Sequence, residues 1–278
     1  MSTSRRRAVV VGVDASDSAR QAVGWSAELA SDTGRALLLV HVPATPAPGD
    51  GMLPAWLREL ADTAERQGVD PVEVVLVEGG VADALLEQST PDGFLVVGSY
   101  GEGARAGMLA GTLALALLAR ADSTVAVVRG AAPGLPPPRT GPVVAGVGEG
   151  PAADAVLERA AEIAAAHGAQ VLAVHTWSDI VVTAGGHGMR RAAAHDSELA
   201  ADAVVALESR VARCRELRPD VVIESRVVGD TALRALLDQA ADARAVVVGR
   251  RRGPEAGGML GSTSRGLVEF APCPVVVV

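Results

Sequence analysis

The chain has 278 residues, of which 49% are apolar and 21% charged, enough to build a core in one large domain or two small ones. All 25 basic residues are arginine, and the lack of lysine excludes P-loop hydrolases, protein kinases and Schiff-base enzymes in their usual forms. A net charge of −8, with three tryptophans, one tyrosine and two phenylalanines, argues against a basic or base-stacking surface for nucleic acid.

In chain order, valine-rich runs alternate with helical segments through the first half. Strands are predicted at 8–13, 36–42, 72–77, 94–97 and 124–128, and helices near 17–31, 53–67, 80–89 and 112–120. The strands show no polar alternation, which is typical of parallel strands that helices cover on both faces. Strict alternation of strand and helix predicts right-handed βαβ units and a doubly wound α/β sheet.

The first predicted helix has one face of small apolar residues at the i, i+3, i+4, i+7 spacing of a packed surface. These residues are Ala19, Ala22, Val23, Ser26, Ala27 and Ala30. The second half repeats the stripe with Ala153, Val156, Leu157, Ala160, Ala161 and Ala164. Both helices are therefore expected to pack on a sheet.

The chain is an internal repeat. Val9-Val10-Val11-Gly12 aligns with Val143-Val144-Ala145-Gly146, and Leu38 aligns with Leu172, an offset of 134 residues in both cases. A period this long indicates domain duplication rather than a solenoid.

A segment rich in proline and glycine separates the two copies. We predict a first domain over residues 1–130, a stiff exposed linker over 131–142 and a second domain over 143–278. The second domain carries an insertion at Ser178–Asp196 before its second helix.

The most specific motif follows the fourth predicted strand. It starts at Gly98-Ser99-Tyr100-Gly101 and ends at Gly111-Thr112, where a helix opens. Glycines let backbone amides approach an anion, and a helix N-terminus offers unpaired N–H groups and the positive end of its dipole. Ligands of doubly wound sheets bind beyond the carboxyl ends of the strands, where Asp14 would also lie and accept a hydrogen bond from a ribose or a metal-bound water. The loop therefore predicts a phosphate-binding site.

The spacing Gly98-x2-Gly101-x9-Gly111-Thr112 resembles the nucleotide loop of the ATP-binding universal stress proteins. The strand ending in Asp14-Ala15-Ser16 and the closing valine-rich strand resemble that family too, in both halves, so the chain looks like its tandem form, known from actinobacteria. The resemblance implies two tandem doubly wound domains, each a five-stranded parallel sheet in the order 3-2-1-4-5 flanked by helices.

The resemblance also implies a ligand, ATP with Mg²⁺, and a set of residues that bind it. Val42 would meet the adenine through its backbone, and Asp14 and Gly98 would lie at the ribose. Gly101, Gly111, Thr112 and Leu113 would lie at the phosphates, and the predicted binding set also includes Val13, Ser99 and Gly103. Related proteins usually carry a small hydroxyl residue where this chain has Ala114, so one phosphate contact is expected to be missing.

Two other interpretations of the loop stay open. Gly101-x-Gly103-x-x-Ala106 fits a loose dinucleotide fingerprint, but that motif belongs in the first βα turn, with an acidic residue about 20 positions later. The second interpretation is that the loop is a flexible turn that binds no ligand.

The second half departs from the pattern. Gly148 replaces Asp14, Thr176 stands in the adenine position, and Arg252 occupies the place of Gly101 in a loop one residue shorter. We therefore predict a largely structural second domain and one ATP per chain, in the first half. Family resemblance further implies pairing through the last strands, Val125–Val128 and Val275–Val278, within the chain or in a homodimer; such edges must be paired or covered.

The remaining candidates point to neither a catalytic residue nor a metal site. His41 and His175 occupy equivalent strand positions and are expected to be packed and hydrogen-bonded. His187 and His195 lack a metal-ligand spacing, and Cys273, between prolines before a buried strand, is expected to be inert.

Cysteine usage and the N-terminus predict the cytoplasm as the compartment. Cys214 and Cys273 are too few for a disulfide framework. The arginines at 5–7 resemble an export signal, but the apolar stretch after them ends at Asp14 without a cleavage site. No apolar run approaches the ~20 residues of a membrane helix.

The expected function is that of a nucleotide-dependent stress-response regulator whose protein partner the sequence does not name. A slow ATP hydrolase or nucleotidyl transferase is the first alternative, and it would need a base, for which Asp14 and Glu102 are the candidates. A nucleotide-free scaffold is the second.

Overall fold

The computed structural model describes residues 7–44, 53–101, 111–132, 134–177, 180–182, 188–190, 196–250 and 261–278. The first half contains β1 Val9–Gly12, α1 Asp17–Thr33, β2 Leu37–His41, α2 Ala55–Arg66, β3 Val72–Leu76, α3 Val81–Gln88, β4 Phe94–Gly98, α4 Thr112–Arg120 and β5 Thr124–Val128. Every strand and helix predicted for this half is present, with ends that differ by at most two residues.

The second half repeats this order with one addition. Its elements are β6 Val143–Gly146, α5 Ala152–Ala166, β7 Val171–Trp177, α6 Asp196–Leu217, β10 Ile223–Gly229, α7 Ala232–Ala240, β11 Ala245–Val248, α8 Ser262–Phe270 and β12 Val275–Val277. The predicted insertion contains a small antiparallel hairpin of β8 Ile180–Val182 and β9 Gly188–Arg190.

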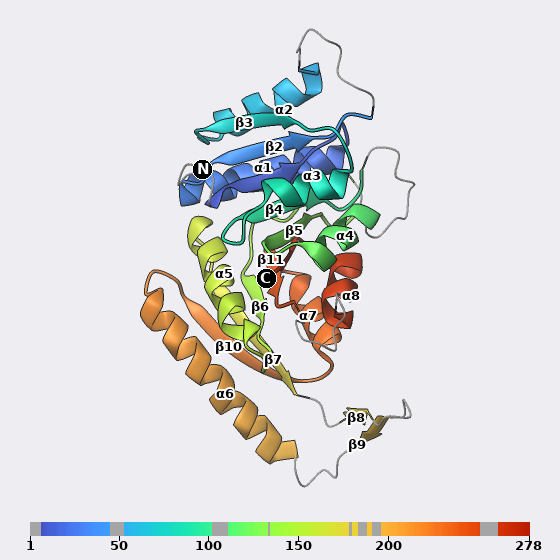
Figure 1. Ribbon diagram of the computed structural model, residues 1–278. Helices are drawn as coiled ribbons and strands as arrows, with labels where there is room; N and C mark the ends of the chain where they lie inside the picture. Colours follow the sequence, from blue (N-terminus) through green and yellow to red (C-terminus); the bar gives the residue numbers. More distant parts are fainter. Residues whose placement is uncertain are drawn as a thin grey trace.

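All strands except this hairpin form one sheet of ten, in the order β10-β7-β6-β11-β12-β5-β4-β1-β2-β3 (Figure 1). Within each half the pairing is parallel and follows the expected order 3-2-1-4-5. The halves meet where β12 pairs antiparallel with β5, with Val276 opposite Ala126. The expected pairing through the last strands therefore occurs within the chain, and the sheet as a whole is mixed.

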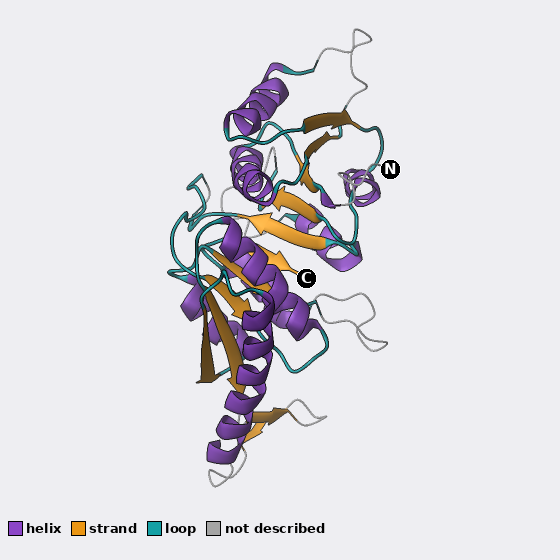
Figure 2. Cartoon of the chain, turned by 90° about the vertical axis from the view of Figure 1, so that its left-hand side faces the viewer, coloured by secondary structure: helices purple, strands orange, loops and turns teal. Residues whose placement is uncertain are grey.

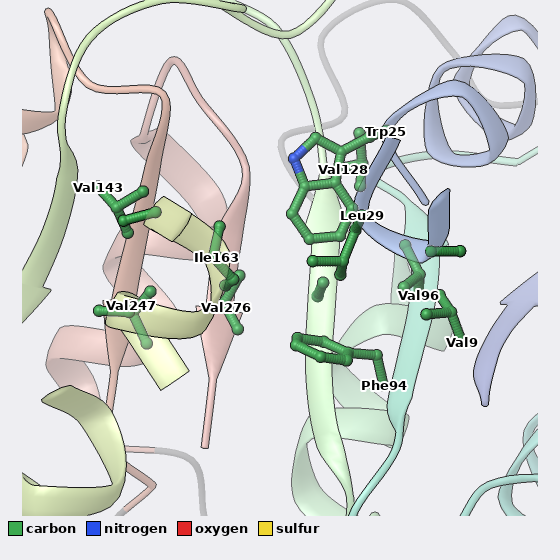
Figure 3. Packing of buried hydrophobic residues seen from close by; sticks show 14 of the residues in the cluster. Val9, Trp25, Leu29, Phe94, Val96, Val128, Val143, Ile163, Val247 and Val276 are labelled. Atoms are coloured by element: carbon green, nitrogen blue, oxygen red, sulfur yellow. The ribbon is translucent and has the colours of Figure 1, made fainter. Parts of the chain in front are cut away.

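Helices lie on both sides of the sheet (Figure 2), and the two predicted helix faces are buried. All six residues of the stripe on α1 and all six on α5 are in the core. Figure 3 shows Trp25 and Leu29 of α1 above Phe94, and Ile163 of α5 beside Val276. These residues belong to one apolar cluster that runs through both halves.

Arginines reinforce the junction between the halves. Arg129, directly after β5, donates from Nη1 to the carbonyls of Val268 and Glu269 at 3.0 and 2.7 Å, near the end of α8. Arg250, after β11, makes the corresponding contact from the second half to the first: its guanidinium donates to the carbonyls of Ala121 and Ser123 beyond α4. Cations are favourable at helix C-termini because the last carbonyls have no partner within the helix.

Two largely buried ion pairs lie beside the sheet junction. Arg35, just before β2, pairs with Glu162 of α5, and Arg244, before β11, pairs with Glu28 of α1 at 3.1 Å. The glutamates are 134 residues apart and therefore occupy equivalent positions in the two copies. Each copy thus supplies one acid and receives one arginine from the other.

Candidate functional site

A cavity of about 820 Å³ opens at the carboxyl ends of β1, β2 and β4. β1 pairs with β2 on one side and with β4 on the other, so this is the point at which the strand order reverses. Eight of the ten residues predicted from the sequence line the cavity: Val13, Asp14, Val42, Gly98, Gly101, Gly111, Thr112 and Leu113. Gly103 lies outside the described residues, and Ser99 does not line the cavity.

Asp14 has a local structural role. Its Oδ1 accepts from the amide and the hydroxyl of Ser16 at 3.0 and 2.5 Å, and the Ser16 Oγ accepts from the Ala19 amide at 3.1 Å. This turn caps the N-terminus of α1. The other carboxylate oxygen lies toward the loop, since a Cβ built on Gly101 would be 2.9 Å from Asp14 Oδ2.

The glycines of the loop are present for different reasons. At Gly98 a Cβ would lie 2.3 Å from the Ser18 Oγ and 2.8 Å from the Ser18 backbone, so the fold itself requires glycine there. At Gly111 the nearest described atom to an added Cβ is the Ser99 carbonyl oxygen at 3.4 Å, an ordinary contact. Packing against the described residues therefore does not demand glycine at 111, whereas an approaching anion would.

The backbone of Ser99 holds the two ends of the loop together. Its amide donates to the Val128 carbonyl at 3.1 Å, and its carbonyl accepts from the Gly111 amide at 2.8 Å. The Ser99 side chain is 7% exposed. Ser99 thus positions the loop and the start of α4.

The N-terminus of α4 faces the cavity. Gly111 is its N-cap residue, in an extended conformation, and among the described residues no side chain caps the first turn. Thr112, Leu113 and Ala114 of that turn line the cavity. The uncapped amides and the dipole make this end of the cavity suited to a negatively charged group.

His41 and His175 are packed and hydrogen-bonded, as expected. The Nδ1 atom of His41 lies 2.9 Å from the Val13 carbonyl, and the edge of Trp56 meets its ring at a centroid distance of 4.9 Å. His175 repeats the contact with the Val147 carbonyl at 2.7 Å. In the first half this bond fixes the end of β1 from which Asp14 follows.

Sequence reasoning missed the apolar wall of the cavity. Val81 and Ala82 at the start of α3, Ala44 after β2 and Ala116 on α4 complete the lining. The only feature of the sequence that indicates these residues is their position in the chain, because the helix after β3 must begin at the same edge of the sheet. Within the described lining Asp14 is the one acidic or arginine side chain.

The second half has a cavity at the equivalent place. It measures about 450 Å³ and is lined by Gly148, His175 and Thr176, at the positions of Asp14, His41 and Val42, and by Arg250 and Thr263. The Arg250 guanidinium nevertheless reaches into the first half. Arg252, expected at the position of Gly101, lies outside the described residues.

The cysteines are inaccessible. Cys214 is buried, Cys273 is fully buried, and burial raises the pKa of the Cys273 thiol to about 12. Among the described residues no cluster of histidine, cysteine and acidic side chains has the form of a metal site; His187 and His195 lie outside them. No described helix is long and apolar enough to cross a membrane.

Comparison with known proteins agrees with this architecture. The model of the universal stress protein family matches residues 5–129 and again residues 140–278. The chain belongs to the universal stress protein family. The universal stress protein Rv2005c of Mycobacterium tuberculosis strain H37Rv is 32% identical over 292 residues, covering 98% of this chain and 97% of the relative.

Solved structures show the same fold over the full length. A universal stress protein from Archaeoglobus fulgidus DSM 4304 superposes with a TM-score of 0.65 at 17% identity, covering 99% of this chain and 98% of that one. A putative universal stress protein from Pseudomonas aeruginosa UCBPP-PA14 gives 0.67 at 16% identity, with coverage of 100% and 95%. At these identities the likeness concerns the fold alone.

Proposed function

We propose that this universal stress protein binds ATP in the cavity of its N-terminal half and acts as a nucleotide-dependent regulator of a stress response. One observation carries the proposal: Asp14, the glycine loop and the uncapped start of α4 converge on one cavity at the point where the strand order reverses. The loose dinucleotide fingerprint starts at Gly101, after β4, and not in the first βα turn.

The residues present fit a nucleotide bound with Mg²⁺. The backbone amides in the first turn of α4, beginning with Thr112, would receive the phosphates, and the carboxylate of Asp14 is the kind of oxygen ligand that Mg²⁺ prefers. The apolar wall of Val42, Val81 and Ala82 would receive the base. A bound Mg²⁺ supplies the positive charge that the described lining lacks.

We assign one nucleotide to each chain. The cavity of the second half has about 450 Å³ against about 820 Å³ in the first, and Gly148 offers no carboxylate there. In the first half Asp14, Thr112 and Leu113 all line one cavity. The second domain then acts as the fixed pairing partner of the first.

Regulation is favoured over hydrolysis because the one carboxylate in the described lining is already engaged in a turn. Asp14 is the only carboxylate in the described lining, and its Oδ1 already accepts two hydrogen bonds from Ser16. Glu102, the other candidate, lies outside the described residues. A slow hydrolase or a nucleotidyl transferase would need one of them to activate the attacking group.

Three measurements on the full-length protein separate the candidate functions. Nucleotide released from the purified protein by acid is identified by chromatography, MgATP binding is measured by calorimetry, and turnover is followed with labelled ATP. Binding near one equivalent without turnover is expected. Multiple turnovers of ATP would favour the slow hydrolase or nucleotidyl transferase. The absence of nucleotide binding would favour the nucleotide-free scaffold. A stoichiometry near two would refute the assignment to one half.

A further inference from the structure

Tyr100, the only tyrosine in the chain, joins the candidate site to the linker between the halves. It lines the cavity next to Gly101. Its amide donates to the Ser18 Oγ in the first turn of α1 at 3.4 Å, and its hydroxyl accepts from the Gly134 amide of the linker at 3.0 Å. One residue thus contacts the loop, the helix that follows Asp14, and the linker.

The linker is a folded connection. A Cβ on Gly130 would lie 2.3 Å from the Leu135 carbonyl oxygen, so the chain turns back closely after β5. The Leu135 amide donates to the Ala132 carbonyl at 3.0 Å, and Gly134 has a φ of +81°, which favours glycine. The Gly134 amide therefore points to Tyr100 from a defined turn.

The far end of the linker is attached to the junction between the halves. Arg139 pairs with Glu28 of α1, and its carbonyl accepts from Arg244. Arg244 itself pairs with Glu28 at 3.1 Å. A change at Tyr100 would therefore act on a segment whose other end lies among the ion pairs between the two domains.

We infer that Tyr100 is a positioning residue that couples nucleotide occupancy of the N-terminal cavity to the order of the linker. The inference rests on the proposed function, because it needs a ligand held between Gly101 and the first turn of α4. A bound phosphate fixes the backbone next to Tyr100 and so holds its hydroxyl where it accepts from Gly134. The nucleotide then stabilises the form of the linker in which the Gly134 amide donates to the Tyr100 hydroxyl, called here the closed linker.

Thermodynamic linkage makes the inference quantitative. If the nucleotide stabilises the closed linker by a given factor, the closed linker must raise nucleotide affinity by the same factor. Removing the hydroxyl removes the coupling and leaves both partners otherwise intact. For a partly exposed neutral hydrogen bond the factor is about threefold to tenfold.

The test uses trypsin cleavage of the full-length protein after Arg139, which is 74% exposed and yields fragments 1–139 and 140–278. Saturating MgATP should slow this cleavage about threefold to tenfold in the native chain. In Tyr100→Phe at saturating MgATP, cleavage should stay at the rate without nucleotide. Calorimetry should show that Tyr100→Phe weakens MgATP binding by the same factor. Leu135→Ala, which keeps both the hydroxyl and the Gly134 amide, should retain the protection.

The outcomes separate this inference from the proposed function. If calorimetry detects binding but the native chain is cleaved equally fast with and without MgATP, the coupling is wrong and ATP binding stands. Equal protection of Tyr100→Phe and the native chain would also overturn the role of Tyr100. If calorimetry detects no binding to the native chain, the proposed function fails, and the coupling fails with it.

Discussion

Gly111→Val is the most direct test of the candidate site, because an added Cβ there makes only ordinary contacts with the described residues. A Cβ at Gly111 lies 3.4 Å from the Ser99 carbonyl oxygen and 4.0 Å from the Tyr100 Cα. The residue has φ −72° and ψ 150°, an extended conformation that valine adopts readily. The branched side chain instead projects beside the first amides of α4, where the phosphates are expected.

The loss of affinity should reach at least about 1.4 kcal/mol, a factor of ten, since a phosphate held at contact distance from these amides cannot share the space with two methyl groups. The effect on stability is expected to be smaller. Valine caps a helix less well than glycine by about 1 kcal/mol, which lowers the melting temperature of a chain of this size by about 2–4 °C.

The matched control is Gly261→Val in the second half. Gly261 is the N-cap of α8, with φ −60° and ψ 148°, so valine has the same capping cost there. Calorimetric titration of MgATP should show a tenfold or greater loss for Gly111→Val and native affinity for Gly261→Val, with similar melting temperatures. Unchanged affinity in Gly111→Val would refute the site, and a loss in Gly261→Val alone would move it to the second half.

Three further predictions concern the carboxylate, the junction and pH. Asp14→Asn keeps an oxygen for the Ser16 turn but removes the charge, so it should lower MgATP affinity by about 1–3 kcal/mol with an unchanged melting temperature. Asp14→Ala should lower both the affinity and the melting temperature. Equal affinity of Asp14→Asn and the native chain in calorimetry would leave the residue with only its capping role. Arg35→Ala removes a side chain that is 4% exposed and paired with Glu162, and should lower the free energy of unfolding in urea by about 3 kcal/mol. The control Arg120→Ala, whose pair with Asp83 is exposed, should lower it by about 0.5 kcal/mol or less. Similar losses in the two variants would show that the pair of Arg35 contributes little. Burial and the nearby Arg244 and Arg139 lower the pKa of His167 from 6.5 to about 4, so the unfolded chain binds the proton more readily. Stability should therefore fall by about 2 kcal/mol as the pH drops from 7 to 5. This decline should be absent in His167→Leu, and an equally steep decline in that variant would assign it to other groups.

The order of elements was predictable from the sequence because each strand is a short valine-rich run and each helix has one apolar face. β5 was predicted at its exact bounds, since Thr124–Val128 is a purely buried run between polar neighbours. Helix ends were less certain. The helix α1 continues beyond the last apolar residue of the stripe to Thr33, because Gly34, in a left-handed conformation, ends it.

The candidate site was predictable to the extent that its residues follow strands. Asp14, Val42 and Gly98 come directly after or at the ends of β1, β2 and β4, and parallel strands bring such positions to one edge. Ser99 was predicted as a binding residue but does not line the cavity, and its backbone holds the two ends of the loop together; spacing does not distinguish a backbone that holds a loop from one that meets a ligand. Contacts between distant segments, such as Tyr100 with Gly134, carry no sequence pattern at all.

The two copies use equivalent positions for different purposes. The amides of Ser99 and Arg250 make the same bond, to the carbonyls of Val128 and Val278 at 3.1 and 2.8 Å, so the two residues occupy the same place after the fourth strand of each copy. In the first half the carbonyl of Ser99 closes the loop onto Gly111. In the second half a long arginine at this place crosses to the end of α4. Because that arginine also lines the smaller cavity, a ligand there would compete with the bonds that join the two halves. Domain pairing within one chain thus gives a physical reason for the second site to diverge while the first keeps its glycine loop.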